Sequence, residues 1–521
     1  MTERRRSPGR GRAKRAQPHT DISTETTADP YLPAPDSGGG GAPGDAAGDG
    51  ERTAVPHSND GDEGSGGNGG ERSGSAPAAS DGSGGGEAPA GDSSQAQDNG
   101  QQQWQGAHGH RGGRRGRRNR RGRRRSPDQQ QQGGGAPSPQ AGPPPVIVPD
   151  GVTEGWFDPS REAGFIRRAH NSYLAEQGDA YVGPHLVRQY GLRRGDKVVA
   201  ATGHDHRGRA IVAEITKLDG AEPVAGARRV EFQSLIASYP DRRLTLETGR
   251  SAKNGGPELT RRAIDLIAPI GYGQRALIVA PARAGKTMLL HAITEGIALN
   301  HPNAELLILL VDERPEEVSE AISWEVGEVV ASSFDQPAKR HVEVVEMVLE
   351  RARRMVEQGK DVVIVLDSLT RMARAFNTAE RGTGRTLSGG LDSSAMARPK
   401  AFFGSARSIA PQHGGGSLTI IATALVETGS RMDDVIFEEF KGTGNCEIKL
   451  DRSLAEKRIF PAFDIATSGT RREEKLYRED QLQAIYMLRR GLQQMPPQTA
   501  MEWLIKRIQG TASNDALLGG L

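Results

Sequence analysis

GQRALIVAPARAGKTMLL, residues 273–290, decides the fold of this chain of 521 residues. An apolar run at 276–279 leads into a turn of small residues, then into Gly-Lys-Thr and an amphipathic stretch. This order predicts a strand, a phosphate loop and a helix, because backbone N–H groups at a helix N-terminus bind anions. Lys286 can reach the β- and γ-phosphates of a nucleotide, and the Thr287 hydroxyl suits Mg²⁺. The alternative is a surface turn that matches the pattern by chance.

Further along the chain, apolar runs alternate with helical patterns. The runs at 306–311, 362–366 and 418–422 are apolar on both faces, as buried parallel strands are. The stretch 341–357 has apolar residues at helical spacing. The sequence therefore predicts an α/β domain with an open parallel sheet, whose ligands lie at the carboxyl ends of the strands.

Acidic residues stand at two of those strand ends. Asp367 directly follows one apolar run, the usual place for a carboxylate that holds Mg²⁺ through water. Glu313 follows another and is a candidate for the base that orients an attacking water. Either acid could instead cap a helix. Two such acids in a sheet with a phosphate loop favour a catalytic role.

The region before the sheet predicts a small barrel of the oligonucleotide-binding kind. Its five candidate strands are 152–157, 164–167, 180–182, 197–201 and 210–215. Phe165 and Arg167 share one of these strands, and Asp179 and Tyr181 stand at another. Aromatic rings stack on bases and Arg binds phosphate, so these strands could bind a single strand of RNA. The alternative is that Phe165 and Tyr181 belong to the barrel core.

Four regions follow from these patterns. Residues 1–145 have almost no apolar periodicity and predict a long disordered region. The barrel spans 146–222, a connector spans 223–255, and the α/β domain with the phosphate loop spans 256–521. Ten Arg lie between residues 111 and 125, which predicts contact with RNA or DNA phosphates, unless this block only keeps the chain soluble.

Composition excludes some classes of protein. A single cysteine, Cys446, rules out a disulfide framework and a zinc site made of cysteines. The chain has neither an apolar run of membrane length nor a signal-peptide pattern, so we expect a cytoplasmic protein that makes no membrane contact.

Two loops rich in glycine and hydroxyl groups each carry a cation. They span 382–390 and 428–431 and could contact a moving strand, although plain surface loops have the same composition. Arg458 and Arg471 lie in a basic stretch after the last predicted strand. Either could be an arginine finger aimed at the γ-phosphate of a neighbouring subunit, or a surface salt bridge.

Several longer runs of the chain resemble one protein family. From Gly271 to about Arg471 the chain is similar to the ATPase domain of the Rho family of bacterial transcription termination factors, which are RNA-dependent hexameric helicases. Among the similar runs are LVDERPEEV (310–318), EVVASSFDQPAKRHV (328–342), DSLTRMARAFN (367–377) and AEKRIFPAFDIATSGTRREE (455–474). The resemblance implies a RecA-like P-loop fold behind an OB or cold-shock-like barrel, and the cofactors ATP and Mg²⁺.

The resemblance also implies roles for individual residues. Catalysis would involve Lys286, Glu313, Asp367, Arg458 and Arg471, with Arg471 supplied by the next subunit. Thr287 and Asp367 would hold the metal, and Met288 and Phe460 would flank the adenine. The remaining ATP contacts would be Gly271, Tyr272, Gly273, Gln274, Arg275, Ala276, Arg283, Ala284, Gly285 and Arg314. RNA would meet Phe165, Arg167, Asp179 and Tyr181 on the barrel, and Arg385, Thr386, Leu387, Ser388, Gly389, Gly390 and Arg431 in the central channel of the ring.

The function implied is that of a homohexamer that moves along single-stranded RNA and releases it from the RNA polymerase elongation complex. Two alternatives stay open: a subunit of a rotary-type ATPase, and an RNA-binding protein without catalysis. The chain has Ala163 where the family usually has a stacking Phe, and Arg209 where it has Tyr. Its RNA preference is therefore left open by the sequence.

Overall fold

The computed structural model describes residues 147–380, 388–392 and 394–521. The predictions made for residues 1–145 and for Arg385, Thr386 and Leu387 lie outside these described residues. The described chain holds a closed barrel of five strands and a separate sheet of nine strands. This confirms the predicted fold class of a small barrel followed by an α/β domain.

The barrel closes in the strand order β1-β2-β3-β5-β4. The strands are β1 (Gly151–Ser160), β2 (Ala163–Arg167), β3 (Ala180–Val182), β4 (Lys197–His204) and β5 (Ala210–Leu218), with helix α1 (Pro184–Tyr190) after β3. Phe157, Ile166 and Val182 are fully buried and fill the interior. Side chains alternate along each strand, so the neighbours of these residues point outward.

The nine-stranded sheet has a parallel centre. Its main path runs β14-β13-β7-β12-β10-β8-β9, with parallel pairing from β13 to β9. The strands are β7 (Arg275–Pro281), β8 (Glu305–Glu313), β9 (Glu328–Ser333), β10 (Asp361–Asp367), β12 (Ser417–Val426), β13 (Cys446–Lys449) and β14 (Gly469–Thr470). Four of these strands match the predicted runs, whereas β9, β13 and β14 were not predicted.

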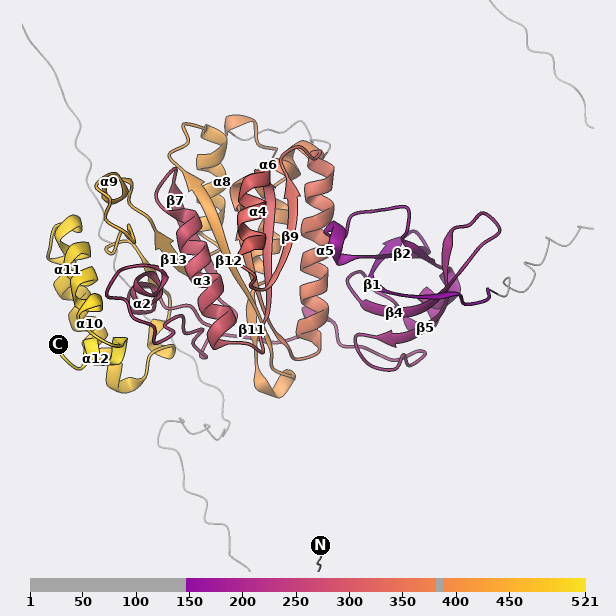
Figure 1. Ribbon diagram of the computed structural model, residues 1–521, viewed down its shortest axis with the longest axis horizontal. Coiled ribbons are helices and arrows are strands. Elements are labelled where there is room, and N and C mark those ends of the chain that lie inside the picture. The colour runs from indigo at the N-terminus through magenta and orange to yellow at the C-terminus, as the bar shows by residue number, and fades with distance from the viewer. Residues whose placement is uncertain (1–146, 381–387, 393) are drawn as a thin grey trace, which may run out of the picture. The chain divides into compact units, whose positions relative to one another are not determined.

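Helices cover both faces of this sheet (Figure 1). Along β7, Ile278 faces one hydrophobic core, while Leu277 and Val279 face the other. The first core contains α2 (Pro257–Ile267), α3 (Lys286–Asn300), α9 (Arg452–Glu456), α10 (Glu479–Gln493), α11 (Pro497–Gln509) and α12 (Asn514–Leu518). The second contains α5 (Ala338–Glu357), α6 (Leu369–Ala379), α7 (Ala397–Gly404) and α8 (Arg431–Lys441). Helix α4 (Pro315–Ser323) packs on β8 through Ala321.

The predicted connector is partly built into the sheet. Its strand β6 (Ala237–Ser238) pairs with β11 (Arg407–Ile409), which pairs with β12. Leu244 and Leu246 are fully buried in the first core. Two-residue strands carry no readable alternation, so the sequence pattern did not predict this pairing.

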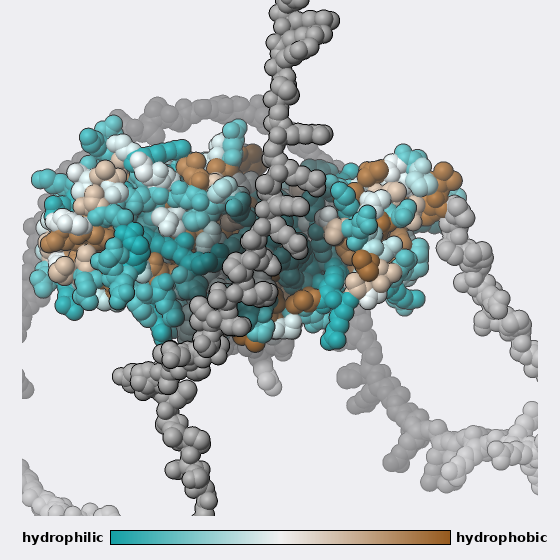
Figure 2. All heavy atoms as spheres, turned by 90° about the horizontal axis from the view of Figure 1, so that it is seen from below, coloured by the Kyte–Doolittle hydropathy of each residue, from teal (hydrophilic) through white to brown (hydrophobic). Residues whose placement is uncertain are grey.

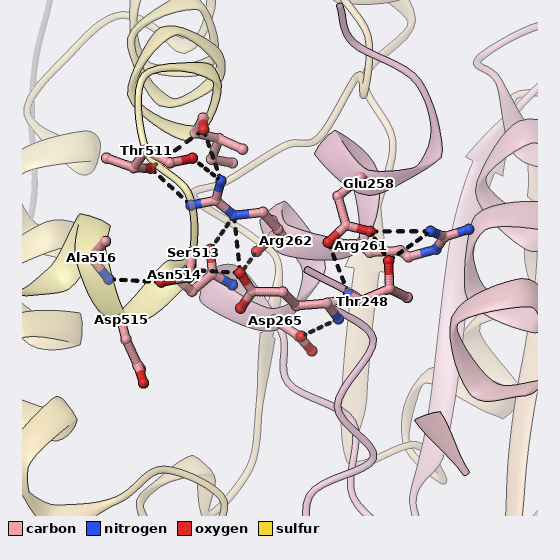
Figure 3. Close-up of polar contacts among 12 residues, drawn as sticks. Thr248, Glu258, Arg261, Arg262, Asp265, Thr511, Ser513, Asn514, Asp515 and Ala516 are labelled. Atoms are coloured by element: carbon pink, nitrogen blue, oxygen red, sulfur yellow. Dashed lines mark hydrogen bonds and ion pairs between the residues drawn. The ribbon is translucent and has the colours of Figure 1, made fainter. Parts of the chain in front are cut away.

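A buried arginine joins α2 to the C-terminal helices. Arg262 is 1% exposed and donates hydrogen bonds to the Ile508 carbonyl (2.8 Å), the Thr511 carbonyl (2.6 Å) and Asn514 Oδ1 (3.0 Å). Figure 3 shows its guanidinium between the end of α11 and the start of α12. The last carbonyls of a helix have no partner within the helix, so Arg262 supplies the donors that α11 lacks.

No helix among the described residues is long and apolar enough to cross a membrane. Figure 2 shows a face on which hydrophilic residues predominate and hydrophobic ones occur in small groups.

We predict that Arg262→Met destabilises the folded chain by about 3 kcal/mol, because it removes the donors to the Thr511 carbonyl and Asn514 Oδ1 and one of the donors to the Ile508 carbonyl. Urea unfolding measured by circular dichroism checks this value. The matched control is Arg250→Met, which removes an exposed arginine paired with Glu295 and should change stability by less than about 1 kcal/mol. Equal effects of the two changes would contradict the prediction.

Candidate functional site

The phosphate loop lies between β7 and α3, at the carboxyl edge of the parallel sheet. Gly285 has φ of 92° and stands at the N-cap of α3, a conformation that favours glycine. A Cβ at Gly285 would lie 3.3 Å from the ring of Phe460. Met288, in the first turn of α3, is 64% exposed. Ala282 and Arg283, in the loop itself, are also exposed. The loop is therefore open to solvent and has an aromatic ring on one side.

Lys286 contacts both candidate acids. Its Nζ forms an ion pair with the Asp367 carboxylate and lies 3.7 Å from Glu313 Oε1. Both carboxylates are buried, and Asp367 Oδ1 also accepts a hydrogen bond from Thr423 Oγ1 at 2.7 Å. The structure thus brings together the predicted lysine and the two predicted acids from β8, β10 and α3.

The alternative that these acids cap helices is wrong. The N-cap of α6 is Ser368, whose Oγ accepts the N–H of Arg371 at 3.3 Å. The N-cap position of α4 is Arg314, not Glu313. Each acid is the last residue of its strand, and the helix is capped by the residue that follows it.

A bulge in β8 turns Glu313 toward this site. Asp312 has φ of 57°, and the pairing with β9 shifts register between Val311 and Glu313. Arg371 donates to the Asp312 carbonyl, and its Nε lies 3.1 Å from Glu313 Oε1. Arg371 was not predicted, although it stands four residues after Asp367, one helical turn into α6.

The carboxylates fit a divalent cation. Glu313, Glu317 and Asp367 each offer an oxygen within 4.8 Å of the others. Glu313 Oε2 is buried and has no hydrogen-bond partner among the described residues. Carboxylate oxygens are the ligands that Mg²⁺ prefers, so an acceptor left open here suits Mg²⁺ or a water bound to it. Glu317, which lies 3.7 Å from Arg314 across the first turn of α4, was not predicted.

The site raises the pKa of Glu313. Burial and the nearby charge of Asp367 raise this pKa to about 7 from the usual 4.5, although Lys286 and Arg371 act in the opposite direction. Near neutral pH this carboxyl can therefore both accept and release a proton, as a base acting on water needs to do.

The predicted ATP contacts Gly271 to Ala276 do not reach this site. They lie at the amino end of β7, about 20 Å from the phosphate loop at a strand rise of about 3.3 Å per residue. Gly273 N–H donates to Thr419 Oγ1 (2.8 Å), and the Gln274 amide donates to Asn445 Oδ1 (2.7 Å). Within one subunit these residues hold the sheet together, because a strand of seven residues separates them from the phosphate loop. Their contact with ATP stays a prediction.

The two candidate finger arginines lie at opposite ends of β13. Arg458 follows α9, just before Phe460, on the side of the phosphate loop. Arg471 follows β14, and its N–H donates to the Asn445 carbonyl at 2.9 Å beside the amino end of β7. Both side chains are exposed, and neither forms an ion pair with another described residue. The two arginines therefore cannot serve the same nucleotide within one subunit.

The barrel presents the predicted aromatic pair on its outer surface. Phe165 and Tyr181 are cross-strand partners with ring centroids 5.7 Å apart, and both are partly exposed and absent from the core. The alternative that they fill the barrel is therefore wrong. Arg167 lies 5.1 Å from the Phe165 ring and pairs with Asp158 (3.1 Å) and with Asp179. Asp179 keeps a buried Oδ1 that has no partner within the described chain.

The two departures from the family pattern have different surroundings. Ala163 shares the outward face of β2 with Phe165 and is 8% exposed. Arg209 is on the turn between β4 and β5, where its Nε donates to Asp205 Oδ2 at 2.8 Å. Its side chain is 67% exposed, so the turn uses only part of its guanidinium.

The two predicted channel loops meet each other. Ser388–Gly390 form a short turn, and a Cβ at Gly389 would lie 2.6 Å from the backbone nitrogen of Met432. Gly389 therefore packs against the backbone that follows Arg431, at the start of α8. Its φ of 80° adds a second reason for glycine at this point.

We predict that Glu313→Gln changes how stability depends on pH. Because the folded pKa lies above the unfolded value, the contribution of Glu313 to wild-type stability falls as pH rises from about 4.5 to 7 and is constant above that. The glutamine cannot ionise. In thermal unfolding without nucleotide, the Tm of the variant relative to that of the wild type should therefore be higher at pH 8 than at pH 5. The exposed control Glu456→Gln should show no such trend, and a pH-independent difference for Glu313→Gln would refute the prediction.

Two parts of the chain match known protein families. Residues 153–223 match the family model "Rho termination factor, RNA-binding domain", and residues 260–470 match "ATP synthase alpha/beta family, nucleotide-binding domain". A solved ATPase of a type III secretion system covers 59% of this chain and 93% of its own, at 23% identity and a TM-score of 0.45, a likeness too low to bear on function.

The curated relatives are more similar. Transcription termination factor Rho of Gemmatimonas aurantiaca is 72% identical over 73% of this chain, which spans only about half (52%) of that relative. The Rho proteins of Chromobacterium violaceum and Pseudomonas aeruginosa are each 50% identical, over 72% and 71% of this chain, and each is covered over 86% of its length. With both the RNA-binding domain and the nucleotide-binding domain present, this chain belongs to the Rho family of transcription termination factors.

Proposed function

We propose that this chain is an RNA-stimulated ATPase that moves along single-stranded RNA as a ring of identical subunits and ends transcription. The observation that carries this proposal is helix α6, which begins at the buried acids, contacts the loop at Gly390 and reaches the 428–431 loop through Asp433. A helix is a rigid element, so a change at its first turn moves what its later turns hold.

The ATPase centre would use the residues around the phosphate loop. Backbone N–H groups at the start of α3 and Lys286 bind the β- and γ-phosphates. Glu313 accepts the proton of the attacking water, because its carboxyl is buried beside Lys286 and its pKa is about 7. Asp367 and Thr287 would hold Mg²⁺, which neutralises charge on the phosphates when bound.

Coupling to RNA would pass along α6. In its first turn, Arg371 contacts Glu313. One turn later, Arg374 forms a fork to Asp433 of α8 (2.8 Å through Nε), and Asp433 also accepts from Thr428 Oγ1 at 2.6 Å. A further turn on, the Asn377 amide donates to the Gly390 carbonyl at 3.3 Å. The state of the nucleotide therefore has a direct physical route to the Gly389–Gly390 and Arg431 loops.

The position of Arg471 supports assembly with identical subunits. It lies at the opposite end of the sheet from the phosphate loop of its own subunit, so it can act as a finger only on the nucleotide of another subunit. A homohexamer with RNA in its channel would use every subunit in this way. The partners we propose are single-stranded RNA and the RNA polymerase elongation complex, in the cytoplasm.

The rival functions predict different behaviour. A rotary-type ATPase subunit needs no nucleic-acid platform, whereas this chain carries Phe165, Tyr181 and Arg167 on the outer face of its barrel. An RNA-binding protein without catalysis would have no use for Lys286, Glu313 and Asp367 packed at one point.

We predict that single-stranded RNA raises the ATPase rate of the full chain severalfold or more, and that Lys286→Ala abolishes the rate with and without RNA. Hydrolysis assays with poly(C) and with the other homopolymers measure this stimulation and its base preference. Lys441→Ala, which removes an exposed lysine outside the phosphate loop, is the control for loss of a lysine. A rate that is indifferent to RNA would rule out the proposed motor and favour the rotary-type function.

We predict that Phe165→Ala weakens RNA binding to the full chain by about 1–3 kcal/mol, which is roughly 5- to 150-fold in Kd, because it removes one stacking ring. Fluorescence anisotropy with a labelled single-stranded RNA at fixed salt measures the change. Tyr239→Ala, a change of an exposed aromatic residue outside the barrel, is the control. Unaltered affinity of the Phe165 variant would show that RNA does not use this face.

A further inference from the structure

The segment that carries Arg471 is fixed by hydrogen bonds to residues outside the segment. It comprises Ser468 to Glu473 and contains β14, which is only two residues long and pairs with β13. The Thr470 hydroxyl donates to the Pro269 carbonyl at 2.7 Å, and Arg471 N–H donates to the Asn445 carbonyl at 2.9 Å. These bonds fix the backbone on one side of the segment and leave the Arg471 side chain exposed.

One guanidinium, that of Arg489 on α10, contacts the segment on both flanks of Arg471. Its Nη2 donates to the Ser468 carbonyl at 2.7 Å, three residues before Arg471. Its Nη1 pairs with the Glu473 carboxylate, two residues after Arg471. Both side chains of this ion pair are largely buried, at 15% and 16% exposed. Arg489 therefore bridges the two ends of a short exposed loop.

The loop is shaped to admit this guanidinium. A Cβ at Gly469 would lie 2.9 Å from Arg489 Nη2, so a side chain at this position would push the arginine away. Arg472, just past Arg471, has φ of 59°, which turns the chain sharply into the short helix Glu473–Lys475. That turn brings Glu473 back to the same arginine that Ser468 contacts.

We infer that Arg489 is a positioning residue for Arg471: it fixes the loop from which Arg471 reaches the γ-phosphate of ATP in the neighbouring subunit. The inference rests on the proposed role of Arg471 as an arginine finger. A finger acts only when its charge arrives within a fraction of an ångström of the transferring phosphoryl group, and a misplacement of about 1 Å can cost roughly 100-fold in rate. Arg489 itself stays away from the nucleotide.

The hydrogen-bonding geometry of Arg489 predicts how much activity each substitution at this position should lose. An arginine fork can donate in two directions at once, whereas a lysine ammonium is a compact charge that reaches one partner well. Arg489→Lys should therefore keep part of the function, and Arg489→Ala should lose it. Arg490, the next residue on α10, is exposed and forms no ion pair with the described residues, so Arg490→Ala is the matched control.

The experiment measures RNA-stimulated ATP hydrolysis by the full chain at saturating RNA, with RNA affinity and assembly size measured in parallel. Arg489→Ala should lower kcat about 10- to 100-fold, with the KM for ATP and the Kd for RNA within twofold of wild type. Arg489→Lys should recover part of that loss, and Arg490→Ala should match wild type. A wild-type kcat for Arg489→Ala, or a loss that appears in KM or in assembly size, would overturn the inference.

A double variant separates this inference from the proposed function. If Arg489 acts through Arg471, the pair Arg471→Ala and Arg489→Ala should be no slower than Arg471→Ala alone, whereas independent effects that multiply would overturn the inference. If Arg471→Ala alone keeps wild-type turnover, the finger role itself fails. Should Arg489→Ala not fold, Glu473→Gln tests the same bridge from its other side, and the same fall in kcat is expected. Unchanged kcat in that variant would overturn the inference.

Discussion

Two buried carboxylates at the edge of one sheet impose the constraint on which the rest of the site depends. Glu313 and Asp367 end neighbouring strands that pair in parallel, so the backbone brings like charges together. Such a pair persists only with cations beside it, and Lys286 and Arg371 supply them. Burial, and after it the remaining repulsion from Asp367, keep the pKa of Glu313 raised. Burying two carboxylates together lowers the stability of the folded chain, and it also gives Glu313 a pKa suited to proton transfer near neutral pH.

The cations that satisfy the acids also connect the site to the rest of the domain. Lys286 belongs to α3, which begins at the phosphate loop, and Arg371 belongs to α6, whose later turns contact Asp433 and Gly390. A ligand that draws Arg371 away from Glu313 would therefore move or strain α6. Under the proposed function, the balance of charge at the nucleotide site would be passed through α6 to the loops proposed to hold RNA.

Two arginines elsewhere in the domain also hold separate segments together through hydrogen bonds. Arg262 completes the end of α11, and Arg489 of α10 holds the segment around Arg471 (Figure 3 shows the first of these contacts). The planar fork of arginine suits both positions, because each must satisfy acceptors from two separate segments. The C-terminal helices thus fix the geometry of a surface that faces away from their own phosphate loop.

The sequence by itself determined the phosphate loop, four parallel strands of the sheet, the barrel, and the choice of Lys286, Glu313 and Asp367 as candidates for one site, because long apolar runs and strand-end acids are local signals. Only the tertiary structure decided which distant residues meet. It moved Gly271–Ala276 to the far end of β7, separated Arg458 from Arg471, joined Gly389 to Arg431, and added Arg371 and Glu317 to the site. These outcomes depend on strand order and on a bulge at Asp312, and neither leaves a periodic trace in the chain, since pairing between strands is a non-local interaction.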